Sequence, residues 1–206
     1  MTEVGFIGDI HGCLDELRET VEAATERTAH LVFLGDYVNR GPDSRGVIDY
    51  LITLNASTLR CTFLLGHHDE AFRDAIVADG LDRFLRMGGA ATVSAYIDQP
   101  YGDVGAQLRS QVPAEHVRFL TSLQSVEQTE EYLAAHAAEY AERQPGIDWA
   151  SDTRYRILGH APRLSGVPTV APHTALIDTG CGTYPGARLT CLFWPSLTWL
   201  QSSATA

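Results

Sequence analysis

Short apolar runs alternate with helical patterns over the first eighty residues of this chain. The runs at residues 4–9, 31–34 and 61–65 are rich in large and β-branched apolar side chains, which predicts three strands. Between the first two runs, apolar residues recur at spacings of three and four over residues 14–24, which is typical of an amphipathic helix. Strands that alternate with helices indicate an α/β fold.

The middle of the chain, about residues 81–123, is predicted to be a helical insert. Its helix-forming stretches are 81–87, 90–97 and a segment opened by Pro113. Strand patterns return at 132–135, 155–158, 175–177 and 189–194. No internal repeat or low-complexity linker separates these parts, so we expect one domain over residues 1–206.

Composition excludes several classes of protein. The 206 residues include 15 Lys and Arg against 26 Asp and Glu, a formal net charge of −11. General nucleic-acid binding needs a basic face, which this balance does not favour, whereas a phosphorylated substrate stays open. The longest apolar runs fall far short of the roughly 20 residues that span a bilayer, so no membrane association is expected. Four widely spaced cysteines suit reduced thiols and a cytoplasmic protein.

The candidate chemistry lies where the predicted strands end. The first three end in the segments Gly8-Asp9-Ile10-His11-Gly12, Gly35-Asp36-Tyr37-Val38-Asn39-Arg40-Gly41 and Gly66-His67-His68-Asp69. Two later strand patterns end in His136 and His160. Ligands of open α/β sheets bind at the carboxyl ends of the strands, so we expect these side chains to converge. Asp9 and His11, two residues apart on an extended segment, would point to the same side.

Mixed carboxylate and imidazole ligands suit Mn²⁺, Fe²⁺ or Zn²⁺ better than an all-oxygen calcium site. Two aspartates and four histidines at strand ends exceed what one tetrahedral ion needs. They indicate two divalent metal ions that share a carboxylate at a separation of about 3.5–4 Å, the arrangement used for in-line displacement at phosphorus.

In this order along the chain, the motifs resemble those of the calcineurin-like metallophosphoesterases. The similarity is greatest to the branch of bacterial phosphoprotein phosphatases and diadenosine tetraphosphatases. It extends over nearly the whole chain, including residues 86–92, 177–180 and 188–190. The resemblance implies a central β-sandwich flanked by helices, with two metal ions at its edge.

Roles for individual residues follow from their place in these motifs. The resemblance makes Asp9 and His11 ligands of the first ion, Asp36 the bridge, and His67, His136 and His160 ligands of the second. Arg40 would bind the substrate phosphate through its permanently charged guanidinium group. His68 would protonate the leaving oxygen, while a metal-bound hydroxide attacks phosphorus.

The chain departs from its family at two of these positions. Residue 67 is normally asparagine and residue 39 is normally aspartate, but here they are His67 and Asn39. The family's aspartate orients the leaving-group histidine and stabilises its charged form, which a neutral amide does less well. We therefore expect His68 to be a less effective general acid, with Asp69 as an alternative partner. Arg154 and Arg156 are candidates for a second phosphate-binding arginine.

The sequence favours a phosphomonoesterase that contains two metal ions, with manganese expected first and iron or zinc as alternatives. Phosphoserine or phosphothreonine in proteins is the first expected substrate, beside small phosphoesters. A dinucleoside-polyphosphate hydrolase is the alternative within the same chemistry. Asn39 and His67 together keep open a degenerate phosphatase that binds metal and phosphate as a regulatory module. His30, His116 and His173 lie outside the motifs and are expected at the surface or at helix caps.

Overall fold

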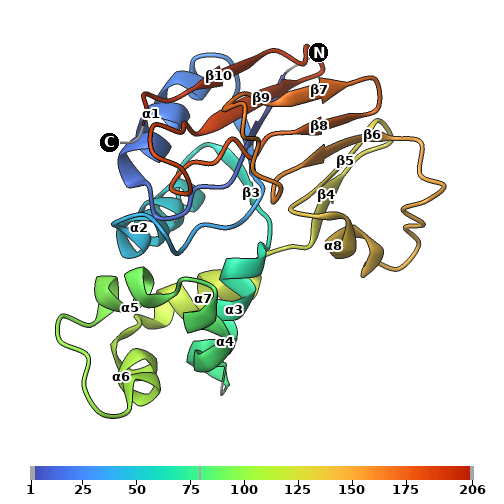
Figure 1. The fold of residues 1–206 in the computed structure, drawn as a ribbon. Coiled ribbons are helices and arrows are strands. Elements are labelled where there is room, and N and C mark those ends of the chain that lie inside the picture. The colour runs from blue at the N-terminus through green and yellow to red at the C-terminus, as the bar shows by residue number, and fades with distance from the viewer. Residues whose placement is uncertain (1–2, 79, 205–206) are drawn as a thin grey trace.

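A computed structural model describes residues 3–78 and 80–204. Over these residues the strands form two sheets of five, stacked with helices outside them (Figure 1). The strands of the first sheet are β1 (Val4–Ile7), β2 (His30–Phe33), β3 (Arg60–Phe63), β9 (Thr190–Trp194) and β10 (Trp199–Gln201). Their order is β10-β9-β1-β2-β3, with β1, β2 and β3 parallel and the other two pairs antiparallel. The parallel strands therefore end at one edge.

The second sheet has the order β4-β5-β6-β8-β7. Its strands are β4 (Val126–Gln128), β5 (Tyr132–Ala135), β6 (Tyr155–Leu158), β7 (Thr169–Ala171) and β8 (Thr174–Leu176). Strands β5, β6 and β8 run parallel, and the edge strands β4 and β7 run antiparallel to them. The short edge strands β4 and β7 carry partly exposed residues, which explains why the apolar pattern did not predict them.

The two sheets are held together by an apolar layer between them. Phe6 of β1 and Val32 of β2 are buried in one cluster with Ile157 of β6 and Ala175 of β8. The ring of Phe6 meets that of Tyr132 edge-on, with centroids 5.2 Å apart. Side chains alternate between the faces of a strand, so the residues beside Phe6 face the helices instead. The predicted β-sandwich is confirmed.

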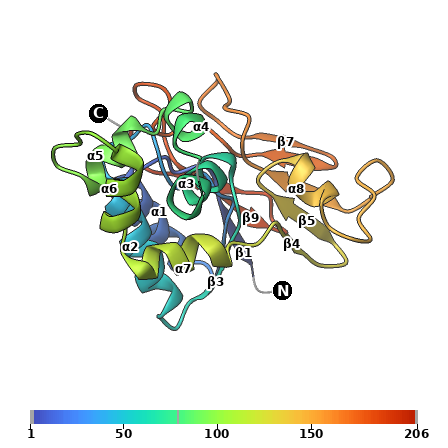
Figure 2. The ribbon, with the colours of Figure 1, turned by 90° about the horizontal axis from the view of Figure 1, so that it is seen from below.

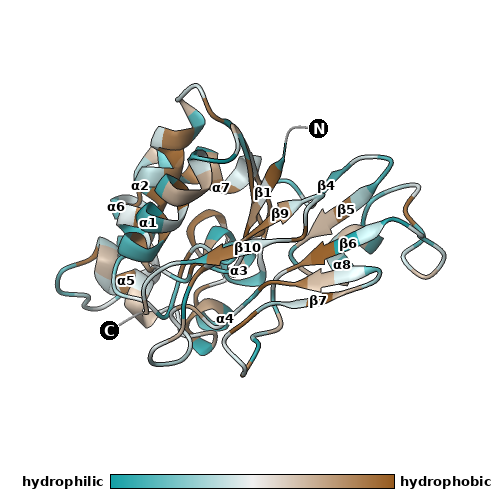
Figure 3. Ribbon diagram, turned by 90° about the horizontal axis from the view of Figure 1, so that it is seen from above, coloured by the Kyte–Doolittle hydropathy of each residue, from teal (hydrophilic) through white to brown (hydrophobic). Residues whose placement is uncertain are grey.

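Helices cover the outer face of the first sheet. Figure 2 shows α1 (Leu14–Thr25) and α2 (Ser44–Asn55) beside its strands, and Figure 3 shows hydrophobic and hydrophilic residues mixed along α2. Helix α1 buries Leu17, Val21 and Ala24, three residues of the predicted apolar face. Asp43 begins α2 by accepting a hydrogen bond from the backbone N–H of Gly46 at 2.8 Å, as a helix cap does.

The predicted helical insert is present below the sandwich (Figure 1). Its helices are α4 (Leu81–Arg86), α5 (Ala90–Tyr96), α6 (Val104–Gln111) and α7 (Ala114–Ser122). Helix α3 (His67–Val77) precedes the insert, and a short α8 (Ala138–Glu142) follows β5. Helix α6 has few apolar residues and buries only Gly105 and Leu108, so the apolar pattern of the sequence did not predict it. Residues 66–69, predicted as a turn, contain the N-cap and first turn of α3, where Asp69 accepts a hydrogen bond from Gly66 at 3.1 Å.

Candidate metal centre

The carboxylate of Asp36 is the centre of a buried cluster at the ends of the strands. Asp36 follows β2, and its side chain is 4% exposed. Its Oδ2 atom lies 3.5 Å from Nε2 of His136, 3.8 Å from Nε2 of His11 and 4.0 Å from Nε2 of His68. The ends of β1, β2 and β5 and the start of α3 therefore meet at one carboxylate, the position expected for a bridging ligand.

Asp9 reaches the same cluster from the end of β1. Its two carboxylate oxygens accept hydrogen bonds from the backbone N–H of His160 at 3.1 and 3.2 Å. Its Oδ1 atom lies 3.9 Å from Nδ1 of His136. A side chain at residue 159 would place its Cβ atom 2.3 Å from this oxygen. Gly159 is therefore required for the close approach of β6 to Asp9.

His11 faces Asp36 through a turn rather than an extended strand. Strand β1 ends at Ile7, and His11 has a left-handed backbone with φ of 48°. The expectation of one extended segment through Asp9 and His11 is wrong, because the chain turns after the strand. The ring nitrogen Nδ1 of His11 donates to the carbonyl of Val38 at 3.1 Å, which leaves Nε2 toward Asp36.

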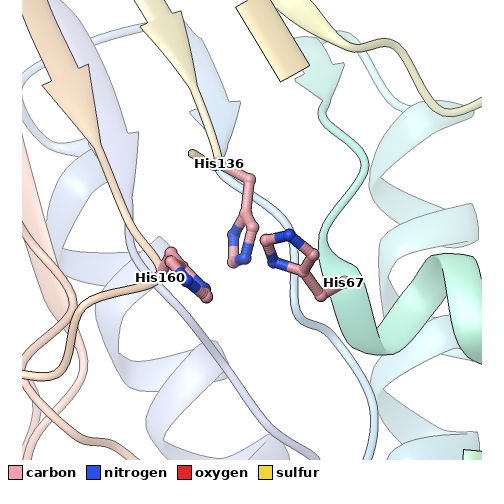
Figure 4. A group of neighbouring side chains, drawn as sticks. All are labelled: His67, His136 and His160. Atoms are coloured by element: carbon pink, nitrogen blue, oxygen red, sulfur yellow. The ribbon is translucent and has the colours of Figure 1, made fainter. Parts of the chain in front are cut away.

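Three imidazoles converge on the other side of the cluster (Figure 4). His136 follows β5, His160 follows β6, and His67 begins α3. One ring nitrogen from each lies within 4.8 Å of the others. The same limit holds for Asp9, Asp36 and His136, and for His11, Asp36 and His68. The predicted ligands are thus together, and their division between two ions stays a prediction.

The electrostatics of the cluster fit divalent cations. Burial raises the pKa of Asp9 and Asp36, and nearby carboxylates raise it further. Burial also lowers the pKa of His136, which favours a neutral ring. Nδ1 of His136 donates to the carbonyl of Leu34 at 3.1 Å, which leaves a lone pair on Nε2. In the described ranges, this Nε2 and Nδ1 of His67 are buried without hydrogen-bond partners. Cations would pair with both the carboxylates and these nitrogens.

His68 contacts Asn39, as the motif positions predict. Nδ2 of Asn39 donates to Nδ1 of His68 at 2.8 Å. The amide orientation follows from Thr92, whose hydroxyl accepts from the backbone N–H of Asn39 at 2.9 Å and donates to its Oδ1 at 2.7 Å. The proton of neutral His68 therefore lies on Nε2. Burial and then the charge of Arg40 lower the pKa of His68 to about 4.

Arg40 stands at the edge between this cluster and a cavity of about 540 Å³. Its Nη2 atom is 3.5 Å from Nε2 of His68, and its Nη1 atom donates to the hydroxyl of Thr183. The cavity is lined by Arg40, Thr183, Tyr184 and Pro185 together with acidic residues of α1. Residues 183–185 therefore form part of the pocket edge. The position of Arg40 suits an anionic substrate group that spans cluster and cavity.

Asp69 and the two candidate arginines have other partners in the structure. Asp69 accepts hydrogen bonds from the backbone N–H groups of Asp36 at 2.7 Å and Tyr37 at 2.9 Å. It holds the loop that carries Asp36, and its carboxylate is committed there rather than to His68. Arg154 pairs with Asp152, and Arg156 donates to the carbonyl oxygens of Trp149 and Asp152.

Two residues have roles that their motifs alone did not reveal. Asp178 is buried, accepts a hydrogen bond from Gly180 at 2.9 Å and raises the pKa of Asp9 by its charge. The sequence signal was its place after the strand pattern that became β8. His116, expected at the surface, is instead fully buried and hydrogen-bonded to Tyr96 at 2.7 Å. Its spacing of three and four residues before Phe119 and Leu120, which places it on the buried face of α7, was the signal.

Comparison with known proteins agrees with this fold and site. A family model described as calcineurin-like phosphoesterase matches residues 2–197. The chain therefore belongs to the calcineurin-like phosphoesterase family, as the motif order predicts. No helix in the described part of the chain is long and apolar enough to cross a membrane.

Curated relatives share parts of the sequence. A symmetrical bis(5'-nucleosyl)-tetraphosphatase of Buchnera aphidicola is 42% identical over 66 residues, or 31% of this chain and 23% of that protein. Its counterpart in Nitrosospira multiformis is 34% identical over 99 residues, or 47% of this chain and 33% of that protein. The matched segments thus span only 23% to 33% of the relatives' length.

Solved structures share the whole fold. A candidate diadenosine tetraphosphatase superposes with a TM-score of 0.69 and 21% identity, covering 99% of this chain and 94% of that chain. A cold-active protein-tyrosine phosphatase of a Shewanella species gives a TM-score of 0.61 and 12% identity, covering 98% of this chain and 81% of that chain. At these identities the likeness concerns the fold alone.

Proposed function

We propose that this protein is a metal-dependent hydrolase of dinucleoside polyphosphates. The observation that carries the hydrolase is the cluster of carboxylates and imidazoles around Asp36, beside the guanidinium of Arg40. The substrate class is supported by the names of the curated relatives. It differs from the first expectation, a phosphomonoesterase acting on phosphoserine or phosphothreonine, and keeps the same chemistry at phosphorus.

When bound, two divalent cations would polarise phosphoryl oxygens and generate a nucleophile at neutral pH. The residues of this chain do the rest. Arg40 binds the phosphoryl oxygens, because its planar guanidinium forms paired hydrogen bonds with phosphate. Asp9, Asp36 and His136 would hold the cations against the strand ends. Asp69 keeps Asp36 in place through the backbone of its loop.

The neutral side chain of Asn39 beside His68 supports a phosphoanhydride substrate rather than an alkyl phosphoester. Because Asn39 donates to Nδ1, His68 presents an Nε2–H group that donates a hydrogen bond but gives up its proton poorly. An alkoxide leaving from phosphoserine requires that proton. A phosphate group leaving from a polyphosphate departs as an anion, since its second pKa is only about 6. The site therefore suits a phosphate leaving group.

The cavity beside Arg40 supports a small molecule as substrate. Its volume of about 540 Å³ lies within the range of roughly 300–1,000 Å³ typical of ligand pockets. Tyr184 at its wall is 38% exposed and offers an aromatic ring to a nucleobase. In this arrangement, polyphosphate lies along Arg40 and a nucleoside enters the cavity. Manganese as the native metal and a cytoplasmic location stay predictions.

A substrate panel tests the proposal. The full chain, loaded with Mn²⁺ or with Zn²⁺, is given diadenosine tetraphosphate, a phosphoserine peptide and an aryl phosphate, and products are separated by chromatography. We expect the highest kcat/KM with the dinucleotide, and no turnover in Asp36→Asn. A faster reaction with the phosphopeptide would favour the protein phosphatase instead. Metal binding without turnover of any substrate would favour the regulatory module.

A further inference from the structure

The histidine that departs from the family pattern has a carboxylate partner outside the cluster. Nε2 of His67 lies 2.7 Å from Oε1 of Glu139, the second residue of α8. The side chains are 19% and 48% exposed, so the contact lies at the rim of the site. Because a carboxylate only accepts hydrogen bonds, Nε2 of His67 must carry the proton.

The other ring nitrogen of His67 faces the metal centre. Nδ1 is buried and has no hydrogen-bond partner among the described residues. The ring centroid of His67 lies 5.0 Å from that of His136 and 4.5 Å from that of His160. Figure 4 shows the three rings converging from β5, β6 and α3. With its proton on Nε2, His67 has a free lone pair on Nδ1, toward these rings.

Helix α8 holds Glu139 in place by further contacts with α3. The hydroxyl of Tyr140 donates to Oε2 of Glu70 at 3.4 Å, and Nη1 of Arg143 donates to Oε1 of Glu70 at 3.0 Å. The ring of Tyr140 also packs 5.0 Å from that of His67. Both partners of the His67–Glu139 hydrogen bond are therefore fixed by elements that pack together.

We propose that Glu139 is a positioning residue that orients His67 as an Nδ1 ligand, so that a cation is held by three imidazoles and selected as Zn²⁺ over Mn²⁺. Imidazole nitrogen suits zinc, whereas manganese prefers oxygen ligands. A carboxylate that accepts from the second nitrogen of a ligand histidine fixes its tautomer and raises its basicity. This inference rests on the metal centre of the proposed function and deepens it.

Nuclear magnetic resonance tests the tautomer without any metal. In the metal-free protein labelled with ¹⁵N at histidine, we expect His67 to show the Nε2–H tautomer. In Glu139→Ala, we expect the two neutral tautomers of His67 to exchange. A wild-type His67 with its proton on Nδ1 would overturn the proposal, because the nitrogen facing the cluster would then have no lone pair to offer.

Metal-binding titrations test the selectivity. Zn²⁺ and Mn²⁺ are each titrated against a chromophoric chelator, with metal content measured after dialysis. We expect Glu139→Ala to weaken one Zn²⁺ site by about 10- to 100-fold, the usual effect of losing such a partner. His67→Asn should weaken the same Zn²⁺ site at least about 10-fold and change Mn²⁺ affinity by less than about 3-fold, because an amide oxygen replaces the imidazole.

A matched control lies on the same helix. Glu142→Gln removes an exposed carboxylate from the end of α8, and we expect Zn²⁺ affinity to stay within about 2-fold of wild type, since exposed charges contribute little. Glu139→Gln keeps an oxygen acceptor, so its loss of affinity should be smaller than that of Glu139→Ala. Equal Zn²⁺ affinity in Glu139→Ala and wild type would overturn the proposal.

The outcome is separable from that of the proposed function. The titrations use no substrate, so a protein that cleaves dinucleotides but binds Zn²⁺ equally well with and without Glu139 contradicts this inference alone. A wild-type protein that binds neither metal contradicts both. A protein that shows the Glu139 dependence but cleaves no phosphoester supports this inference and contradicts the proposed hydrolase.

Discussion

The substitution Asn39→Asp would restore a charged partner to His68. The amide nitrogen of Asn39 lies 2.8 Å from Nδ1 of His68, so an aspartate in the same rotamer places a carboxylate oxygen there. The hydroxyl of Thr92 still donates to the other oxygen, as it does to Oδ1 of Asn39 at 2.7 Å. The change therefore adds one charge and keeps the surrounding hydrogen bonds.

The size of the effect follows from this contact. A hydrogen bond to a charged group contributes about 1.5–3 kcal/mol, which corresponds to a pKa increase of about 1–2 for His68. Because the pKa of His68 is about 4 in the present structure, its protonated fraction at neutral pH rises about 10- to 100-fold. The rate on an alkyl phosphate should rise by a similar factor, since the leaving alkoxide requires a proton.

The assay compares substrates on one variant. We expect kcat/KM of Asn39→Asp to rise about 10- to 100-fold with a phosphoserine peptide, but by less than about 3-fold with an aryl phosphate or diadenosine tetraphosphate. The aryl phosphate also reports whether the variant is folded and loaded with metal. Equal increases for all three substrates would refute the role assigned to the Asn39–His68 pair.

Two further predictions concern stability. A cation at about 100 times its dissociation constant should stabilise the metal-free protein by about 2.7 kcal/mol in chemical unfolding. This gain should shrink as the pH falls, because burial raises the pKa of Asp9 and Asp36 and protonated carboxyls do not bind cations. A gain that stays constant as the pH falls would contradict this. His116→Phe should lower the free energy of unfolding by about 2 kcal/mol, because it leaves the buried Tyr96 hydroxyl without its hydrogen-bond acceptor. As a control, Asp49→Asn keeps an oxygen acceptor for His116 and should lower the free energy of unfolding by less than about 1 kcal/mol.

The order of the elements and most of the candidate metal ligands follow from local sequence. The glycines at 8, 35 and 66 allow close backbone approach at strand ends, and each is followed by a ligand type. Gly66, for example, would place a Cβ atom 2.3 Å from Oδ1 of Asp36 if substituted. A parallel sheet brings its carboxyl ends to one edge, so the convergence of Asp9 and Asp36 was predictable without the structure.

Contacts between residues distant in the sequence depend on the tertiary structure alone. Thr92 orients the amide of Asn39 from 53 positions away, and Glu139 meets His67 from 72 positions away. The burial of His116 depends on how α7 packs against α2 and on its hydrogen bond to Tyr96 of α5. Hydrophobic periodicity identifies which face of an element is apolar, whereas the hydrogen-bond partner of a polar side chain depends on which other element packs against it. The sequence by itself thus determined the candidate ligands, and packing between elements determined how they are oriented.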